Sequence, residues 1–188
     1  MACARTTVMP DQTRRRLLSI GAAAAACMMS RPALSAAFAP ARPRTVALQN
    51  LHTGESLRLA YWADGGYLAP SLQQIDRVLR DHRNNQVHAI DPRLIDLLCA
   101  LDGRLGTARA YQVISGYRSP ATNAMLAAES RGVAPHSLHT QGMAIDIRVE
   151  GVPLTRLRDT AKSLGIGGVG FYPRSDFVHV DVGRVRYW

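Results

Sequence analysis

Residues 137–146 read SLHTQGMAID, and residues 177–181 read FVHVD. Apolar and polar residues alternate in both stretches, which is the period of a β-strand with two different faces. If the two strands are neighbours in one sheet, Asp146 and His179 lie on the same sheet face, opposite the isoleucines and valines of the core. His139 comes just before the first strand, in a loop that can fold back over that face. We therefore expect the three side chains to converge.

Two imidazoles and one carboxylate form a ligand set that suits zinc. Catalytic zinc sites usually use three protein ligands and leave the fourth coordination position to water. Zinc in such a site generates hydroxide near neutral pH and polarises a carbonyl group. The sequence therefore favours a zinc hydrolase with one Zn²⁺ per chain, bound by His139, Asp146 and His179. The alternative is that these residues are ordinary polar side chains on a solvated sheet face.

The spacing of these residues resembles a known family of zinc peptidases. The pattern Ser-x-His-x-x-Gly-x-Ala-x-Asp, with a later histidine on a strand, is similar to the zinc D-alanyl-D-alanine carboxypeptidase and dipeptidase family. That family shares its metal-site fold with lysostaphin-type peptidases and the hedgehog signalling domain. The upstream stretch SGYRS, residues 115–119, also matches.

Three further stretches narrow the resemblance to the bacterial murein endopeptidase K group. They are NLHTGE at residues 50–55, GGVGFYP at residues 167–173 and RVRYW at residues 184–188. The resemblance extends from about residue 48 to residue 188. It implies a zinc peptidase with a hedgehog/D-Ala-D-Ala peptidase-like fold that acts on peptidoglycan.

The resemblance also implies the other catalytic residues. In the family, an acidic residue three positions before the last histidine ligand acts as the general base, and Asp176 has this position here. Asp181 is the alternative base, because it shares a strand face with His179; it could instead orient that histidine. Arg118 is implied to polarise the scissile carbonyl or to stabilise the oxyanion, as a fixed positive charge does.

Four other histidines are weaker candidates. His136 lies three residues before His139 and could be a fourth ligand, although a surface or supporting role fits better. His52, His82 and His88 follow no ligand pattern, and we expect them to be solvated.

Three functions are compatible with this set of residues. The favoured one is a murein endopeptidase that cuts D-Ala–diaminopimelate or diaminopimelate–diaminopimelate cross-links, so that the partners are peptidoglycan peptide stems. The second is a D,D-carboxypeptidase that removes a terminal D-alanine. The third is a zinc-bearing cell-wall binding domain without hydrolysis, as in the hedgehog branch of the fold.

The N-terminus resembles a twin-arginine signal peptide. Residues 13–18 read TRRRLL, with a hydroxyl residue, paired arginines and two leucines in the expected order. The apolar run at residues 17–29 is shorter than the about 20 residues that a permanent membrane span requires. The stretches SAA at residues 35–37 and AFA at residues 37–39 are candidate cleavage sites. We therefore expect residues 1–39 to be removed after export to the periplasm by the twin-arginine translocase, without a stable membrane span. Lipidation of Cys27 is the less favoured alternative.

Composition fits one exported domain. Removal of 39 residues leaves about 149, the size of a single domain with one core. The precursor has a net charge of +9, and residues 1–39 hold five arginines and one aspartate, so the remainder keeps +5. This charge favours approach to the anionic cell wall. The sequence shows no basic patch interleaved with aromatic residues, so it does not indicate nucleic-acid binding. Cys99 alone remains after processing, so no internal disulfide can form.

The periodic segments predict an α+β domain with an antiparallel sheet and helices packed on it. Pro40 begins an extended tether at residues 40–47, and the zinc peptidase domain is expected at residues 48–188. Helices are expected after a cap at Ser71, after Asp91, after Ser119 and at residues 153–164, the last stopped by a glycine. Strands are expected at residues 45–51, 57–62, 112–114, 169–172 and 177–182, besides the one that contains Asp146.

Overall fold

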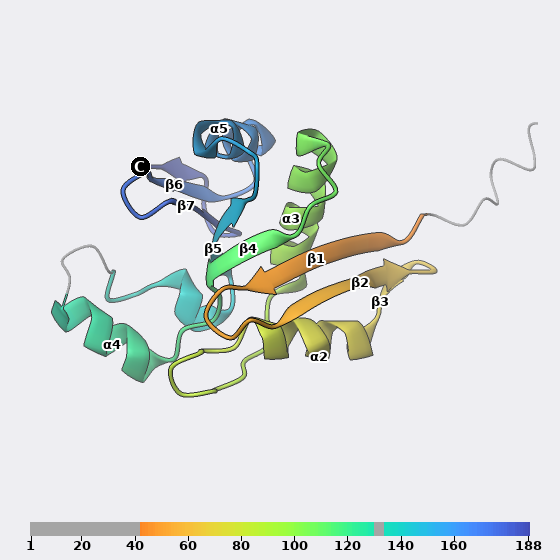
Figure 1. Cartoon of the computed structure of the whole chain (residues 1–188). Helices are drawn as coiled ribbons and strands as arrows, with labels where there is room; N and C mark the ends of the chain where they lie inside the picture. Colours follow the sequence, from red (N-terminus) through yellow and green to blue (C-terminus); the bar gives the residue numbers. More distant parts are fainter. Residues whose placement is uncertain (1–41, 130–133) are drawn as a thin grey trace, which may run out of the picture. The chain divides into compact units, whose positions relative to one another are not determined.

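The computed structural model describes residues 42–129 and 134–188. The predicted signal peptide, residues 1–39, lies outside the described residues. In the described part of the chain, eight strands form one sheet in the order β3-β2-β1-β4-β5-β7-β6-β8 (Figure 1). Their bounds are β1 Arg44–Asn50, β2 Ser56–Ala63, β3 Gly66–Tyr67, β4 Tyr111–Ser115, β5 Ala144–Val149, β6 Gly168–Tyr172, β7 Phe177–Asp181 and β8 Arg186–Tyr187.

Most neighbouring strands are antiparallel, which confirms the predicted fold class. Two pairs are parallel: β1 with β4, and β6 with β8 at the edge of the sheet. The chain reaches β4 only after two helices, so it returns to lie beside β1 in the same direction. The C-terminal strand β8 likewise extends the sheet beyond β6.

The helices begin and end largely where their sequences predict. They are α2 (Ala69–Val78), α3 (Pro92–Leu105), α4 (Pro120–Glu129) and α5 (Leu154–Leu164). Asp91 caps α3 through its side chain, and Gly165 ends α5 with a φ of 63°. The cap predicted at Ser71 is wrong: α2 is preceded by Leu68 and carries Pro70 in its first turn. Proline fixes φ at the helical value, so it starts the helix before Ser71.

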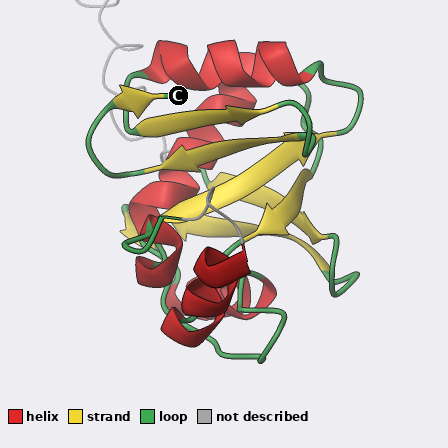
Figure 2. Cartoon of the chain, turned by 90° about the vertical axis from the view of Figure 1, so that its left-hand side faces the viewer, coloured by secondary structure: helices red, strands yellow, loops and turns green. Residues whose placement is uncertain are grey.

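A single hydrophobic core lies between the sheet and the helices α2, α3 and α5. The central strands contribute Ile145 and Ile147 from β5, which lie opposite Val180 and Val178 of β7. Helix α5 adds Leu157, which is fully buried. Figure 2 shows α5 as the uppermost helix, along the edge of the sheet where the C-terminus lies. Because these core residues alternate with polar ones, β5 and β7 present a second set of side chains on the other face.

The tether predicted at residues 40–47 overlaps the first strand. Strand β1 begins at Arg44, and Thr45 already pairs with Ala60 of β2. Residues 44–47 therefore belong to the sheet rather than to a tether at residues 40–47, because their backbone groups bond to β2. Among the described helices, none has the length and apolar character needed to cross a membrane.

Candidate metal centre

Strands β5 and β7 bring a carboxylate and an imidazole face to face. Asp146 and His179 are direct partners across the antiparallel pair. Asp146 Oδ1 lies 2.9 Å from His179 Nδ1. The two strands are therefore neighbours, as the convergence of these residues requires.

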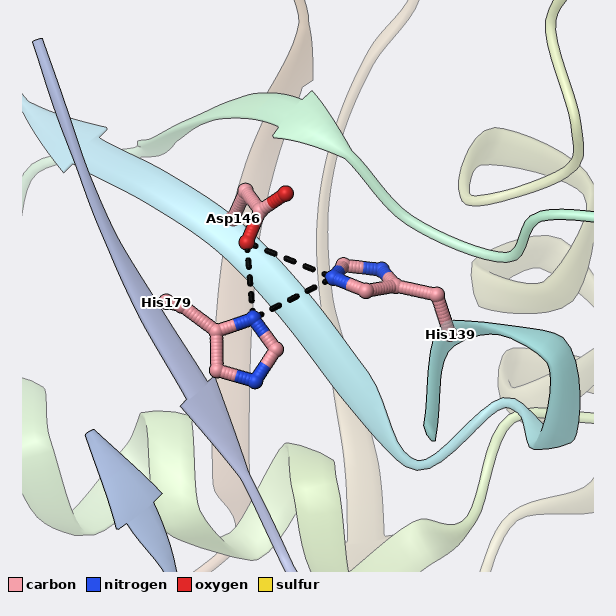
Figure 3. A group of neighbouring side chains, drawn as sticks. All are labelled: His139, Asp146 and His179. Carbon is pink, nitrogen blue, oxygen red and sulfur yellow. Dashed lines mark hydrogen bonds and ion pairs between the residues drawn. The ribbon is translucent and has the colours of Figure 1, made fainter. Parts of the chain in front are cut away.

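His139 approaches the same point from the 3₁₀ turn η1 (Leu138–Gln141) (Figure 3). The hydroxyl of Ser137 accepts a hydrogen bond from His139 N and so caps the turn. Gly142 ends it with a φ of +66°, and a Cβ there would lie 2.4 Å from the carbonyl oxygen of Ala89. The serine and the glycine of the motif thus shape the backbone that carries His139.

The three donor atoms have the spacing of a metal site. His139 Nε2 lies 3.3 Å from Asp146 Oδ1 and 3.2 Å from His179 Nδ1. Tetrahedral ligands at about 2.0–2.1 Å from zinc are roughly 3.3 Å from one another. Within the described residues, these three form the one group of potential ligands that meets this criterion.

In each imidazole ring, one nitrogen points away from the centre and contacts a neighbouring oxygen. This contact determines that the other nitrogen faces the centre. His139 Nδ1 donates to the carbonyl oxygen of Gly116 at 2.7 Å, because a carbonyl can only accept. His179 Nε2 lies 3.1 Å from the carboxylate of Asp181. In the neutral rings, His139 Nε2 and His179 Nδ1 therefore carry lone pairs. Two lone pairs and a carboxylate oxygen at van der Waals distance repel one another, and a cation between them removes the repulsion.

The electrostatic field at the centre also favours a cation. Burial alone would raise the pKa of Asp146, but His139 and His179 hold it well below its usual range. Burial alone would lower the pKa of His179, but the neighbouring carboxylates of Asp146 and Asp181 stabilise its protonated form and raise it. Two ionised carboxylates therefore flank His179, and their field attracts positive charge.

Arg118 lies beside the centre and is held by several weak contacts. Its backbone nitrogen donates to His139 O, and its guanidinium contacts Ser115 Oγ at 3.3 Å and Asn123 Oδ1 at 3.4 Å. One guanidinium nitrogen lies 3.9 Å from Asp146 Oδ2. Arg118 Nε is buried and has no hydrogen-bond partner among the described residues. The guanidinium is thus close to the centre while part of its hydrogen-bonding capacity is unused.

Asp181 lies behind His179 with no exposed surface on its side chain. Its Oδ2 accepts from His179 and from Arg186 at 2.7 Å, and its Oδ1 accepts from the backbone nitrogens of Gly168 and Gly183. Burial opposes ionisation, but these donors hold the pKa of Asp181 well below its usual range. This geometry is that of a carboxylate that orients a histidine.

Asp176 lies outside the centre. It occupies the turn before β7 with a φ of 55°, and its side chain is 63% exposed. Its carboxylate forms an ion pair with Arg148 of β5. The structure therefore groups Arg118 and Asp181 with the three potential ligands, and Asp176 stands apart from them.

A pocket of about 190 Å³ opens over the three potential ligands. Besides Arg118 and the ligands, its walls include aromatic side chains and one further arginine: Tyr172, Phe177, Trp188 and Arg186. Sequence reasoning gave no role to Tyr172, Arg186 or Trp188. The only signal was that the stretches containing them match the murein endopeptidase K group.

The remaining histidines lie away from the ligand group. His136 is exposed and lines the pocket rim, outside the group of potential ligands. His88 is exposed, as expected, and stacks on Tyr117. His52 is exposed and stacks on His82, with ring centroids 3.9 Å apart. His82 is half-buried, and its burial, together with the nearby His52, lowers its pKa to about 4. The expectation that His82 is solvated is therefore wrong, because the loop that carries it packs against His52.

Comparison with known proteins agrees with the resemblance to the murein endopeptidase K group. A family model described as "Peptidoglycan L,D-endopeptidase MepK" matches residues 38–188. A protein of that name from Escherichia coli (strain K12) is 46% identical over 179 residues, which cover 95% of this chain and 98% of the relative. "Probable peptidoglycan L,D-endopeptidase MepK" from Haemophilus influenzae is 42% identical, over 95% of this chain and 96% of the relative. No solved structure matches the chain.

Proposed function

The chain belongs to the family of peptidoglycan L,D-endopeptidases described as MepK, and we propose that it hydrolyses murein cross-links at a zinc ion held by His139, Asp146 and His179. Membership of this family makes it a peptidase that acts on peptidoglycan. The observation that carries the proposal is the convergence of two imidazole nitrogens and one carboxylate oxygen, 2.9–3.3 Å apart, at the base of a pocket.

The ligand atoms in this proposal are His139 Nε2, Asp146 Oδ1 and His179 Nδ1. Bound zinc supplies a water molecule of lowered pKa and a Lewis acid that polarises the peptide carbonyl. Gly116 O and Asp181 hold the outer nitrogens of the two rings, which keeps their inner nitrogens directed at the centre. Such supporting contacts orient the ligands and raise their basicity.

Arg118 is the proposed stabiliser of developing negative charge. Its guanidinium lies on the pocket wall with its side chain 12% exposed, beside Asp146. A fixed cation in a site shielded from water stabilises an oxyanion more strongly than the same cation in bulk solvent.

Asp176 is the proposed general base, and Asp181 the residue that orients His179. Both oxygens of Asp181 are occupied by donors, so it has no free lone pair directed at the pocket. Asp176 has an accessible carboxylate next to Phe177, which lines the pocket. To accept a proton from the attacking water and pass it to the leaving amine, Asp176 must first leave Arg148. Catalytic contacts are often longer before substrate binds than during the reaction.

The proposed substrate is the peptide link between two diaminopimelate residues. The relatives are named for L,D-endopeptidase activity, and a diaminopimelate–diaminopimelate bond joins an L centre to a D centre. The D-alanine–diaminopimelate link and the terminal D-alanine are the alternative substrates. A binding domain without hydrolysis is disfavoured, because family membership indicates a peptidase.

A peptidase that acts on peptidoglycan works outside the cytoplasmic membrane. We propose the periplasm as its location and the twin-arginine translocase as its partner during export. The paired arginines at positions 14 and 15 support this proposal.

The substrate assignment can be tested with defined muropeptides. The purified, zinc-loaded protein would be incubated separately with an L,D-cross-linked dimer, a D,D-cross-linked dimer and a monomeric pentapeptide stem, and the products identified by mass. We expect cleavage of the L,D-linked dimer into monomers, and none by the His139→Ala variant. Release of D-alanine alone would identify a carboxypeptidase, and exclusive cleavage of the D,D-linked dimer would overturn the proposed bond.

A further inference from the structure

Three aromatic side chains form one wall of the pocket next to His179. They are Tyr172, Phe177 and Trp188, here called the aromatic wall. The rings of Tyr172 and Phe177 stack with centroids 4.6 Å apart. Trp188 Nε1 donates to the hydroxyl oxygen of Tyr172 at 2.7 Å. The three rings are therefore linked to one another and form a continuous surface.

The sheet holds Trp188 in a fixed position. Its backbone nitrogen donates to Val169 O, and its carbonyl accepts from Phe171 N, which extends the pairing of β8 with β6. Gly170 lies directly opposite His179 in the sheet. A Cβ on Gly170 would lie 2.7–2.8 Å from the indole, so glycine is what lets the indole lie across this position. The indole centroid is consequently 5.2 Å from that of His179.

Trp188 is not placed there simply to complete the core. Half of its surface, 50%, stays exposed, and the residue lines the pocket. A rigid, half-exposed aromatic surface beside a reacting centre is the usual form of a ligand-binding wall. Aromatic rings offer a large contact area to apolar groups at low cost in side-chain entropy.

The guanidinium of Arg186, which is paired with the buried carboxylate of Asp181, lies at the edge of the aromatic wall. Arg186 Cζ is 4.9 Å from the indole centroid, and the side chain is 32% exposed. The aromatic surface suits a methylene chain, and the exposed part of Arg186 can contact a carboxylate at the end of that chain while its pairing with Asp181 is kept. Diaminopimelate has this chemistry: an aliphatic chain that carries an amino group and a carboxylate at each end.

We propose that the aromatic wall is the subsite for the diaminopimelate side chain that flanks the scissile bond, with Trp188 as the specificity-determining residue. This inference rests on the proposed function and adds the recognition element to it. The methylenes lie against the indole, and the wall thereby sets the position of the peptide bond relative to His139, Asp146 and His179.

A fluorescence titration tests the contact without turnover. The chain has two tryptophans, so Trp62→Phe leaves Trp188 as the only indole; Trp62 packs under Arg44 on β2. A monomeric stem tetrapeptide containing diaminopimelate has no cross-link to cut. We expect it to change the Trp188 emission in a saturable manner, and a peptide-free murein disaccharide to leave it unchanged. A response to the disaccharide would make the wall a glycan site, and no response to either ligand would overturn the subsite; neither result depends on hydrolysis.

Steady-state kinetics tests the effect on the reaction. Trp188→Ala should raise KM for the L,D-linked dimer by about 10- to 100-fold, as expected for losing an apolar contact with a short aliphatic chain. Zinc content and kcat should change little, and Trp188→Phe should recover most of the loss.

Tyr187→Ala is the matched control, because that neighbouring ring is equally exposed and contacts Lys162 of α5 instead of the pocket. An unchanged KM in Trp188→Ala, or an equal rise in Tyr187→Ala, would overturn the subsite. Loss of zinc from Trp188→Ala would assign Trp188 a structural role instead. Cleavage by the wild-type protein shows in each case whether the proposed function itself holds.

Discussion

At the residue scale, each potential ligand has one atom at the centre and a second polar atom fixed by a neighbour. His139 is held through Gly116 O, and His179 through Asp181. Asp146 directs Oδ1 to the two rings and Oδ2 towards Arg118. The side chains are thus oriented before any ligand binds, which lowers the entropic cost of forming a site.

The ligand assignment predicts that His139→Ala and His179→Ala abolish tight zinc binding and hydrolysis. Each change removes one of three donor atoms, and two protein ligands are fewer than a catalytic zinc site uses. Elemental analysis of the purified variants measures the zinc content. His136→Ala is the control: this histidine lies at the pocket rim and should keep one zinc per chain. Full zinc content in either ligand variant would show that the assignment is wrong.

Substitution of Asp181 and of Asp176 by alanine should have different effects on zinc affinity and on kcat. Asp181→Ala removes the acceptor behind His179, and loss of such a partner weakens metal affinity by about 10- to 100-fold. Asp176→Ala should keep zinc and lower kcat by about 10²- to 10⁴-fold, the contribution of a general base. Zinc affinity, measured by competition with a chelator, and kcat for the same preparations separate the two effects.

Arg148→Ala provides the matching test of Asp176, because it removes the ion pair that holds this carboxylate away from the pocket. It should leave kcat unchanged or raise it. If Asp176→Ala has wild-type kcat while Asp181→Ala loses turnover with zinc still bound, the base is Asp181.

At the element scale, the position of His139 depends on how the turn η1 joins strand β5. Gly142 makes this connection with a positive φ, and a Cβ added to it would meet the backbone of Ala89 and Ile90. An L-residue at this position meets two obstacles: the left-handed backbone and the carbonyl of Ala89. The left-handed backbone conformation affects stability alone. Relief of the contact with the carbonyl of Ala89, in contrast, displaces the turn that carries His139.

Gly142→Ala should therefore reduce both stability and zinc affinity. The left-handed conformation costs an L-residue about 1–2 kcal/mol, and relief of the contact with Ala89 moves His139. Gly165→Ala is the control, because its φ is 63° but a Cβ there meets no atom within 4 Å. Urea unfolding should show a loss of stability in both variants, and chelator competition a loss of zinc affinity only in Gly142→Ala. Equal zinc affinities would contradict this account of the turn.

At the scale of the whole molecule, the sheet order assembles the site from distant parts of the chain. Strand β4 brings Ser115 next to Asp146 of β5, and Arg118 follows directly. Strand β7 lies on the other side of β5 and contributes Phe177 to the aromatic wall, while β6 contributes Tyr172 and the residue after β8 is Trp188. The C-terminal strand is thus part of the pocket, so the edge of the sheet serves substrate contact as well as stability.

The export proposal belongs to the whole precursor. Arg14→Lys combined with Arg15→Lys should leave precursor in the cytoplasm, because the translocase recognises the paired guanidinium groups and lysine lacks their planar set of donors. Fractionation followed by immunoblotting measures the distribution of precursor and processed protein. Arg5→Lys, in the same segment but outside the pair, should be exported normally. Unchanged periplasmic accumulation in a strain that lacks the pathway would rule the route out.

The sequence by itself determined the features that depend on local pattern. Alternation predicted the strands that contain Asp146 and His179, and Asp91 and Gly165 marked helix ends that the structure confirms. Strand parity also predicted which residues of each segment share a sheet face: Ala144 with Asp146, and His179 with Asp181. These features depend on neighbouring residues, so a single chain segment contains the information needed.

Only the tertiary structure decided the features that depend on which segments meet. It separated Asp181, bound to His179, from Asp176, which the turn before β7 directs to Arg148. Strand parity cannot predict the direction of a turn residue with positive φ. The tertiary structure also placed Trp188 over Gly170, because β8 pairs with β6 in parallel at the sheet edge. Strand order and edge pairing result from packing of the whole core, so no local pattern in the sequence encodes them.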